Sequence, residues 1–289
     1  MKKIVTLHDG SALEVGLTGD SSAKVIMLPG AKKTVYGDEA ESLAKWGVDP
    51  EAGKKLVEEL SDKFRVLYFD YEDHLFAHPR PDQLTADSVV TDFLRIADEM
   101  NVESFSYYGY SWLALTGLQL GVRSGRLESL IMGGYPPFEG PYREMLIVTQ
   151  KAYEQTLNTY EHSGKGLNAG TSPEEIDWDT VQVSTNSAQT KQFVTLYQSL
   201  TDFDDRKVQH LLSIPKLAFA GDKDSIVYGD NFGGVTVDIA GLLQKHKAKL
   251  QRAGWDVEML TGDGMDHTKA MQPAEVLPLI KPWLIDKLL

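Results

Sequence analysis

The chain has 289 residues, enough for one large domain or two smaller ones. Hydrophobic residues make up 42% of the sequence and charged residues 25%, so the composition is that of a globular protein and excludes a disordered or fibrous chain. The formal net charge of -13 disfavours binding to nucleic acid or anionic lipid, and the absence of cysteine excludes disulfides, thiolate metal sites and cysteine nucleophiles.

The beginning of the sequence predicts neither a secretion signal nor a membrane anchor. The apolar run after Lys2 and Lys3 ends at His8, which is too short for the hydrophobic part of a signal peptide. No segment approaches the roughly 18 uninterrupted apolar residues that indicate a membrane-spanning helix. We therefore expect a cytoplasmic protein whose partner is a small-molecule substrate. The sequence leaves open whether the chain forms a homo-oligomer.

Strand-like runs alternate with longer helical stretches along the chain, and this order predicts an α/β architecture. The first two runs are separated by a short turn and predict an antiparallel pair. The later runs are expected to be reached through helical crossovers, which gives a mostly parallel sheet. The eight predicted strands cover residues 4–7, 13–17, 25–28, 65–70, 104–108, 127–132, 216–220 and 255–260.

Amphipathic patterns predict the helices that accompany these strands. In residues 86–100, apolar side chains recur at helical spacing, whereas Asp87, Asp92 and Asp98 are expected to face solvent. Further helices are predicted at residues 113–122, 235–253 and 273–289.

Between the sixth and seventh predicted strands the pattern changes. This region contains polar helical segments at residues 142–160, 186–200 and 204–212, a glycine-rich stretch at 163–170, and no strand-like run. We therefore predict that residues 136–213 form a helical cap inserted after the sixth strand. The core domain would then consist of residues 1–135 and 214–289.

Gly109, Tyr110 and Ser111 stand between a predicted strand and a predicted helix. A serine at such a corner is held in a strained turn that exposes its hydroxyl at the carboxyl edge of the sheet. A side chain in place of Gly109 would collide with this turn. The amides at the start of the helix would face the serine and stabilise negative charge there. This context makes Ser111 the candidate nucleophile.

A serine nucleophile needs a base and an acid that orients the base. Among the seven histidines, His267 lies in a glycine-containing loop between the last predicted strand and the last helix, from which it can reach the same sheet edge. The others, including His246 on a lysine-rich helix, are interpreted as surface or packing residues. Asp222 and Asp224 both follow the strand at 216–220, and residue type alone does not choose between them.

Four segments resemble the α/β-hydrolase superfamily and together span nearly the whole chain. They are Leu28-Pro29-Gly30, Tyr107-Tyr108-Gly109-Tyr110-Ser111-Trp112, Gly221-Asp222-Lys223-Asp224 and Gly264-Met265-Asp266-His267. The order serine, aspartate, histidine is the one that this superfamily uses. The resemblance implies the α/β-hydrolase fold, a mostly parallel eight-stranded sheet flanked by helices, with a helical cap after the sixth strand. It also selects Asp224, because the acid in relatives usually stands three residues after the glycine, and it implies neither a cofactor nor a metal.

The resemblance assigns the oxyanion hole to the backbone N–H groups of Ala31 and Trp112. Two positions depart from the pattern of the superfamily. Leu113 stands where glycine is common, so a larger side chain must find room beside the neighbouring strands, and Pro29 stands where histidine is common. The two lysines that follow Ala31 are interpreted as solvated side chains rather than as an anion site.

These residues together predict a serine hydrolase for a small or medium carboxylic ester, lactone or thioester. Ser111 would attack the carbonyl carbon, His267 would accept its proton and Asp224 would orient the imidazole, giving an acyl-enzyme that water hydrolyses. Iminopeptidase and C–C hydrolase activity on the same triad are alternatives, because the fold does not choose among these reactions. An alternative of another class is a ligand-binding or sensor module with little turnover. It is considered because Leu113 departs from the common pattern after the serine.

Overall fold

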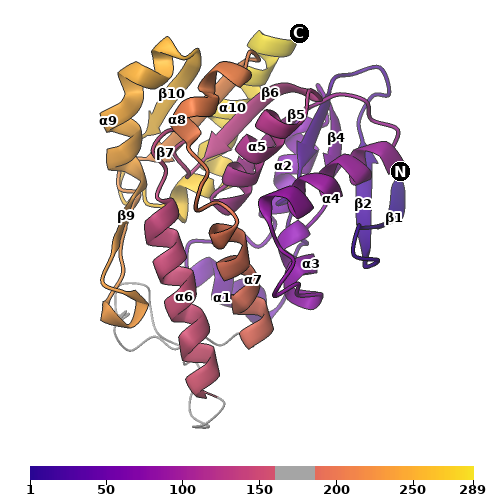
Figure 1. The fold of residues 1–289 in the computed structure, drawn as a ribbon. Helices are drawn as coiled ribbons and strands as arrows, with labels where there is room; N and C mark the ends of the chain where they lie inside the picture. The colour runs from indigo at the N-terminus through magenta and orange to yellow at the C-terminus, as the bar shows by residue number, and fades with distance from the viewer. Residues whose placement is uncertain (160–185) are drawn as a thin grey trace.

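The computed structural model describes residues 1–159 and 186–289. Its centre is an eight-stranded sheet with helices on both faces (Figure 1). The strand order is β1-β2-β4-β3-β5-β6-β7-β10; β2 pairs antiparallel with β1 and β4, and the other pairs are parallel. This confirms the predicted α/β fold with its mostly parallel eight-stranded sheet. The strands are β1 Lys2–Thr6, β2 Ala12–Thr18, β3 Val25–Leu28, β4 Arg65–Tyr68, β5 Phe105–Tyr110, β6 Leu127–Gly133, β7 Lys216–Gly221 and β10 Trp255–Leu260.

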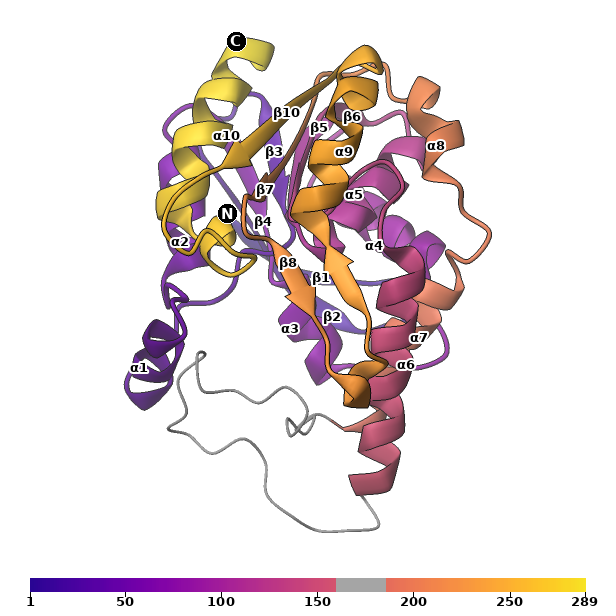
Figure 2. The same ribbon diagram turned by 90° about the vertical axis from the view of Figure 1, so that its left-hand side faces the viewer.

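Two hydrophobic clusters cover the two faces of the sheet. In β3, Met27 belongs to one cluster and its neighbours Ile26 and Leu28 to the other, because side chains alternate across a strand. Helices α4, α5 and α9 lie on one face and α2 and α10 on the other (Figure 2). Their bounds are α2 Ala52–Leu60, α4 Ala86–Glu99, α5 Trp112–Arg123, α9 Ile239–Arg252 and α10 Pro273–Leu288.

Helix α4 departs from its predicted pattern at one residue. Asp87 and Asp98 are exposed as expected, but Asp92 is 0% exposed, so the prediction that it faces solvent is wrong. Its carboxylate accepts hydrogen bonds from Arg80 Nη1 at 2.8 Å and from the hydroxyl of Tyr71 at 2.6 Å. A buried carboxylate is stable when such partners compensate for its lost hydration, and these partners lie outside α4, 12 and 21 positions before Asp92.

The helix predicted at residues 235–253 begins later than expected. Strand β9, Thr236–Asp238, pairs antiparallel with β8, Ser225–Val227, in a small second sheet that the sequence did not predict. Val237 is buried in this pairing, and the side chain of Asp238 caps α9 by accepting the N–H of Gly241 at 2.9 Å. The link between β2 and β3 is also simpler than predicted, because residues 19–24 form a loop without a helix.

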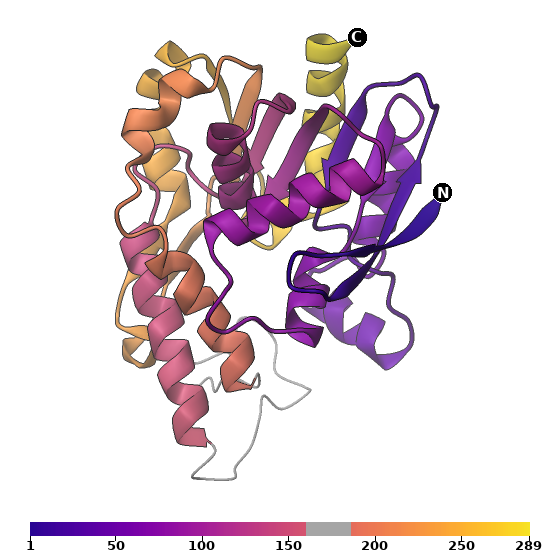
Figure 3. The ribbon, with the colours of Figure 1, turned by 45° about the vertical axis from the view of Figure 1, so that its right-hand side comes forward.

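Between β6 and β7, the described residues include the α-helices α6 Tyr142–Thr159, α7 Ser187–Gln198 and α8 Asp205–Val208. Helices α6 and α7 run side by side (Figures 1 and 3), joined by a contact of 3.1 Å between the hydroxyls of Thr156 and Thr190. Gln192 ties α7 to the segment after β4 through its bonds to the carbonyl of Leu75 and the N–H of Arg80. The predicted glycine-rich stretch at 163–170 and His162 lie outside the described residues.

The remaining elements are short. They are α1 Asp38–Lys45, α3 Tyr71–Ala77 and the 3-10 helices Gln209–Leu211, Asp230–Phe232 and Lys269–Met271. Across residues 1–159 and 186–289, no helix has both the length and the apolar character needed to cross a bilayer.

Candidate active site

Ser111 stands at a sharp corner between β5, which ends at Tyr110, and α5, which begins at Trp112. Its backbone has φ 57° and ψ −131°, a conformation that non-glycine residues rarely adopt and that is found at functional sites. The corner is fixed to the neighbouring strand, because the N–H of Ser111 donates to the carbonyl of Gly133 at 2.8 Å. The local backbone is thus the strained strand-to-helix turn expected from the sequence.

The space around this corner explains two residues beside the serine. A Cβ atom at Gly109 would lie 2.4 Å from the carbonyl oxygen of Leu113, so the predicted collision is confirmed. Leu113 itself is buried, and its Cδ1 lies 3.1 Å from where a Cβ atom of Gly30 would be. The leucine side chain therefore fits the corner because Gly30, in the loop after β3, leaves room for it.

Asp224 and His267 form a hydrogen-bonded pair. The imidazole Nδ1 of His267 lies 3.0 Å from Oδ1 and 2.9 Å from Oδ2 of Asp224, whose side chain is 0% exposed. Gly221 allows their two loops to meet, because a Cβ atom there would lie 2.1 Å from the carbonyl oxygen of Met265. Asp222 makes no hydrogen bond to His267. Of the two carboxylates that residue type left open, the structure thus pairs Asp224 with the histidine.

The imidazole of His267 lies at the same sheet edge as Ser111. A Cβ atom on Gly134 would lie 2.9 Å from His267 Cε1. Gly134 directly follows Gly133, whose carbonyl accepts the Ser111 N–H. Tyr110 also joins the two, since its hydroxyl donates to the carbonyl of His267 at 2.9 Å and its ring centroid lies 5.1 Å from the imidazole. Within the described part of the chain, the Ser111 hydroxyl has no hydrogen-bond partner.

Sequence reasoning missed the role of Tyr110. Burial raises the pKa of its hydroxyl well above the ordinary value, with the Asp224 carboxylate adding to the effect, so the group stays protonated and can donate to the histidine loop. The available signal was a tyrosine directly before the predicted nucleophile. Its partner, a carbonyl 157 positions away, is known only from the tertiary structure.

The two predicted oxyanion donors differ in whether their N–H groups already make a hydrogen bond. The N–H of Trp112, the first residue of α5, bonds to no acceptor in the described residues, as a donor for a substrate oxygen requires. The N–H of Ala31 instead donates to the carbonyl of Phe69 at 3.1 Å, so its role as an oxyanion donor stays a prediction and would require this hydrogen bond to open. The physical reason is that the chain after β3 continues to pair with the chain after β4, as the bond from Tyr71 N–H to Pro29 O at 2.9 Å also shows.

Aromatic side chains surround the residue that follows the serine. The indole of Trp112 packs edge-on against Phe193 of α7, with ring centroids 5.4 Å apart, and lies 6.3 Å from the ring of Tyr71. Helix α7, which lies between β6 and β7 in the chain, therefore reaches the vicinity of Ser111.

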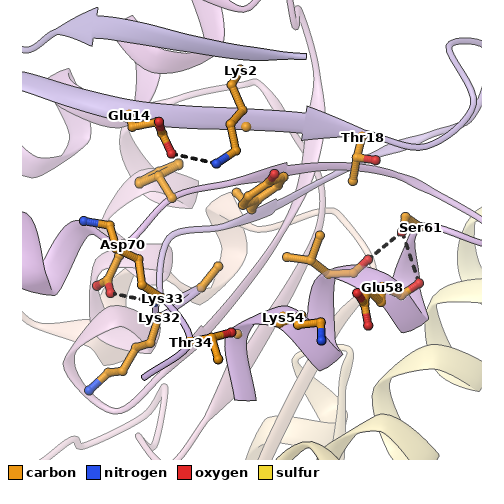
Figure 4. A pocket seen from close by; sticks show the side chains of 16 residues that line it. Lys2, Glu14, Thr18, Lys32, Lys33, Thr34, Lys54, Glu58, Ser61 and Asp70 are labelled. Carbon is orange, nitrogen blue, oxygen red and sulfur yellow. Dashed lines mark hydrogen bonds and ion pairs between the residues drawn. The ribbon is translucent and has the colours of Figure 1, made fainter. Parts of the chain in front are cut away.

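A surface cavity of about 440 Å³ lies beside the loop after β3 but does not contain the predicted triad (Figure 4). It is lined by residues of the first two strands, of α2, of the loop after β3, including Ala31, and of the end of β4 with the residues that follow it, including Asp70. Its charged side chains are largely paired, as in the ion pair of 2.8 Å between Lys2 and Glu14. Of the predicted site residues, all of which lie in the described part of the chain, the cavity therefore contains Ala31 alone, and it is not the place where the predicted triad meets.

Comparison with known proteins bears on the fold. No family model matches the sequence, and no curated protein does either. The structure of the enol-lactonase from Burkholderia xenovorans LB400 is 15% identical, with 99% of each chain covered and a TM-score of 0.57. A structure from a study of carboxylesterases of the thaumarchaeon Nitrososphaera gargenis is 14% identical, with 98% of each chain covered and a TM-score of 0.60.

A third similar structure comes from work on epoxide hydrolases of the α/β-hydrolase superfamily in metagenomes from hot environments. It is 16% identical and has a TM-score of 0.54, with 100% of this chain and 98% of that chain covered. These similarities extend over the whole chain and agree with the strand order described above. The chain has the α/β-hydrolase fold.

Proposed function

We propose that this protein is a serine hydrolase that cleaves a small or medium carboxylic ester, lactone or thioester. The observation that carries the proposal is the hydrogen-bonded pair of Asp224 and His267, 2.9 Å apart, at the sheet edge where Ser111 occupies its strained corner. A buried acid, an imidazole and a hydroxyl in this order are the groups that acyl transfer requires. The similar structures of esterases and a lactonase support the same reaction class.

In this mechanism, His267 accepts the Ser111 proton through Nε2 as the serine oxygen attacks the carbonyl carbon of the substrate. Asp224 holds Nδ1 and stabilises the imidazolium that forms. The N–H of Trp112 receives the oxyanion, and such a donor is worth about 2.7–4 kcal/mol to the transition state. Ala31 acts as the second donor only after its N–H releases the carbonyl of Phe69. Protonated His267 then gives its proton to the leaving group, and water activated by His267 releases the acyl group.

Residues 136–213 are proposed to act as a cap that shapes the acyl pocket. The support for this role is the contact between Phe193 of α7 and Trp112, the residue next to the nucleophile. A hydrophobic wall at this position favours an apolar acyl group over a charged one.

The direct test compares the wild type with Ser111→Ala on p-nitrophenyl esters of increasing length, lactones, thioesters and aminoacyl amides. We expect Ser111→Ala to lower turnover on the order of 10⁴-fold or more, because triad members act as a unit. The control is Ser22→Ala, at an exposed serine, which should leave turnover unchanged. A fluorophosphonate probe should label the wild type at Ser111. Hydrolysis that survives in Ser111→Ala would exclude this mechanism.

A second candidate, a ligand-binding module with little turnover, is favoured by one observation. The Ala31 amide is engaged with Phe69, which leaves a single free donor for an oxyanion. A binding module needs no oxyanion hole, and its Ser111 would not react with the probe although a ligand binds tightly. Stoichiometric labelling would decide for the enzyme.

A further inference from the structure

One carboxylate connects the loop after β3 to the start of α5. Glu72, in α3, accepts a hydrogen bond from Trp112 Nε1 at 2.8 Å through Oε1, while its Oε2 lies 2.9 Å from Nζ of Lys32. Trp112 directly follows the serine at the corner, and Lys32 directly follows Ala31. A single side chain thus bridges Trp112, one of the two predicted oxyanion donors, and Lys32, the neighbour of the other donor, Ala31.

Glu72 lies in the first turn of α3, and this turn is hydrogen-bonded to the loop after β3. The N–H of Tyr71 donates to the carbonyl of Pro29 at 2.9 Å. Asp70 caps α3 by accepting the N–H of Asp73 at 3.0 Å, and its other oxygen accepts the N–H of Lys33 at 3.3 Å. The carboxylate of Glu72 therefore extends from a rigid support rather than from a free loop.

The pair of Glu72 and Lys32 is better enclosed than the pair beside it. The Glu72 side chain is 25% exposed, and its Lys32 partner lies at 2.9 Å. Burial by itself lowers the pKa of the Lys32 ammonium, but the carboxylates of Glu72, Asp70 and Asp73 raise it overall, so Lys32 stays charged at neutral pH. The adjacent pair, Lys33 and Asp73, is longer at 3.3 Å and has side chains 75% and 60% exposed. It serves as a matched control on the same turn.

We propose that Glu72 is a positioning residue for the site around Ser111, an inference that rests on the proposed hydrolase function. Glu72 fixes the indole of Trp112, and its ion pair with Lys32 holds the Glu72 carboxylate in place. The Trp112 amide then stays aimed at the place where the oxyanion forms. A displacement of about 1 Å at such a group can cost about 100-fold in rate, so the loss of this bridge should be visible in turnover.

The kinetic test uses a p-nitrophenyl ester and three variants. Glu72→Leu removes both contacts and should lower kcat about 10- to 100-fold with KM changed by less than about twofold, because an oxyanion donor acts mainly in the transition state. Glu72→Gln keeps an acceptor for Trp112 Nε1 but loses the ion pair with Lys32, so its loss should be smaller. Asp73→Asn removes the same charge one residue away and should leave kcat and KM unchanged.

A second readout follows the bridge without relying on activity. In protein labelled with ¹⁵N-tryptophan, each of the five tryptophans gives one indole N–H signal, and Trp112→Phe identifies the signal of Trp112. Glu72→Leu should shift this signal, because its indole N–H loses its acceptor, whereas Asp73→Asn should leave it in place.

An unchanged kcat in a folded Glu72→Leu, an equal loss in Asp73→Asn, or a rise in KM alone would overturn the proposal. If Glu72→Leu does not fold, Glu72→Gln and Lys32→Met take its place, and each must lower kcat while unfolding at the temperature of the wild type. Failure of the proposed function is distinguishable, because Ser111→Ala would then keep its activity. The positioning role would fall with it, even if the Trp112 signal showed the hydrogen bond.

Discussion

Nδ1 of His267 lies 2.9 Å from Oδ2 of Asp224, and this carboxylate has no exposed surface. Both carboxylate oxygens face the same ring nitrogen, at 2.9 and 3.0 Å. A neutral imidazole held in this way carries its proton on Nδ1 and presents an unprotonated Nε2, which is the form that a general base requires.

Replacing this carboxylate should abolish most of the activity. We expect Asp224→Asn to lower kcat about 10⁴-fold, because an amide can donate to Nδ1 and stabilise the wrong tautomer. Asp222→Asn, in the same loop, should lower kcat by no more than a few-fold. The measurement is ester hydrolysis at pH 7.5. A larger loss for Asp222→Asn would identify the other carboxylate as the acid.

The choice of base is tested by a pair of histidine variants. His267→Ala should lose turnover as severely as Ser111→Ala, since both belong to one catalytic unit. His246 is 2% exposed, and its Nε2 lies 3.1 Å from the Glu139 carboxylate rather than beside Ser111. His246→Ala should keep kcat within about twofold of the wild type. It should unfold at a lower denaturant concentration, because a buried side chain is lost. The reverse pattern of activities would mean that His246 is the base.

The buried ion pair of Asp92 and Arg80 should dominate the stability of α4. We expect Asp92→Asn to lower the free energy of unfolding by up to about 3–5 kcal/mol, because the buried Arg80 would lose its nearer carboxylate and keep only Asp9, whose Oδ2 lies 3.5 Å from Nε. Asp98→Asn, on the same helix, removes an exposed carboxylate paired with Arg126 and should cost less than about 1 kcal/mol. Urea unfolding of both variants measures the difference. Equal costs would show that burial of Asp92 does not set its contribution.

His74 should make stability depend on pH. Burial, with the positive charges of His78 and Arg80, lowers the pKa of its imidazole in the folded chain. The unfolded chain then binds the proton more readily, so the free energy of unfolding should fall as pH drops below about 6.5 and through the folded pKa. His74→Gln should flatten this decline in urea unfolding between pH 7.5 and 5.5. A variant at the exposed His210 should keep the slope of the wild type.

Several parts of the site could be predicted because their cause is local. Gly109 and Ser111 occur between a strand pattern and a helix pattern, and the steric need for glycine there follows from the turn alone. Leu113 could not be interpreted in this way. Whether its side chain fits depends on Gly30, which lies in the loop after β3 and leaves the space that the leucine fills.

The surroundings of Asp92 and of the Ala31 N–H could not be predicted from the sequence, for the same reason. Helical periodicity places Asp92 on the polar side of α4, but Arg80 and Tyr71 provide buried partners that no local pattern reveals. The resemblance predicts Ala31 as an oxyanion donor, and its N–H donates to the carbonyl of Phe69 because the segments after β3 and β4 continue to pair beyond the strands. In both places the hydrogen bond joins separate segments of the chain, so no short stretch of sequence reveals it.

The amino-acid sequence by itself determined the succession of strands and helices, the corner at Ser111, and the three loops that could supply chemistry. These features depend on side-chain periodicity and on backbone geometry over a few residues. Only the tertiary structure decided that Tyr110 binds the carbonyl of His267 and that Glu72 joins Trp112 to Lys32. Such contacts depend on how distant segments pack together, and their partners lie tens to more than a hundred positions apart in the chain.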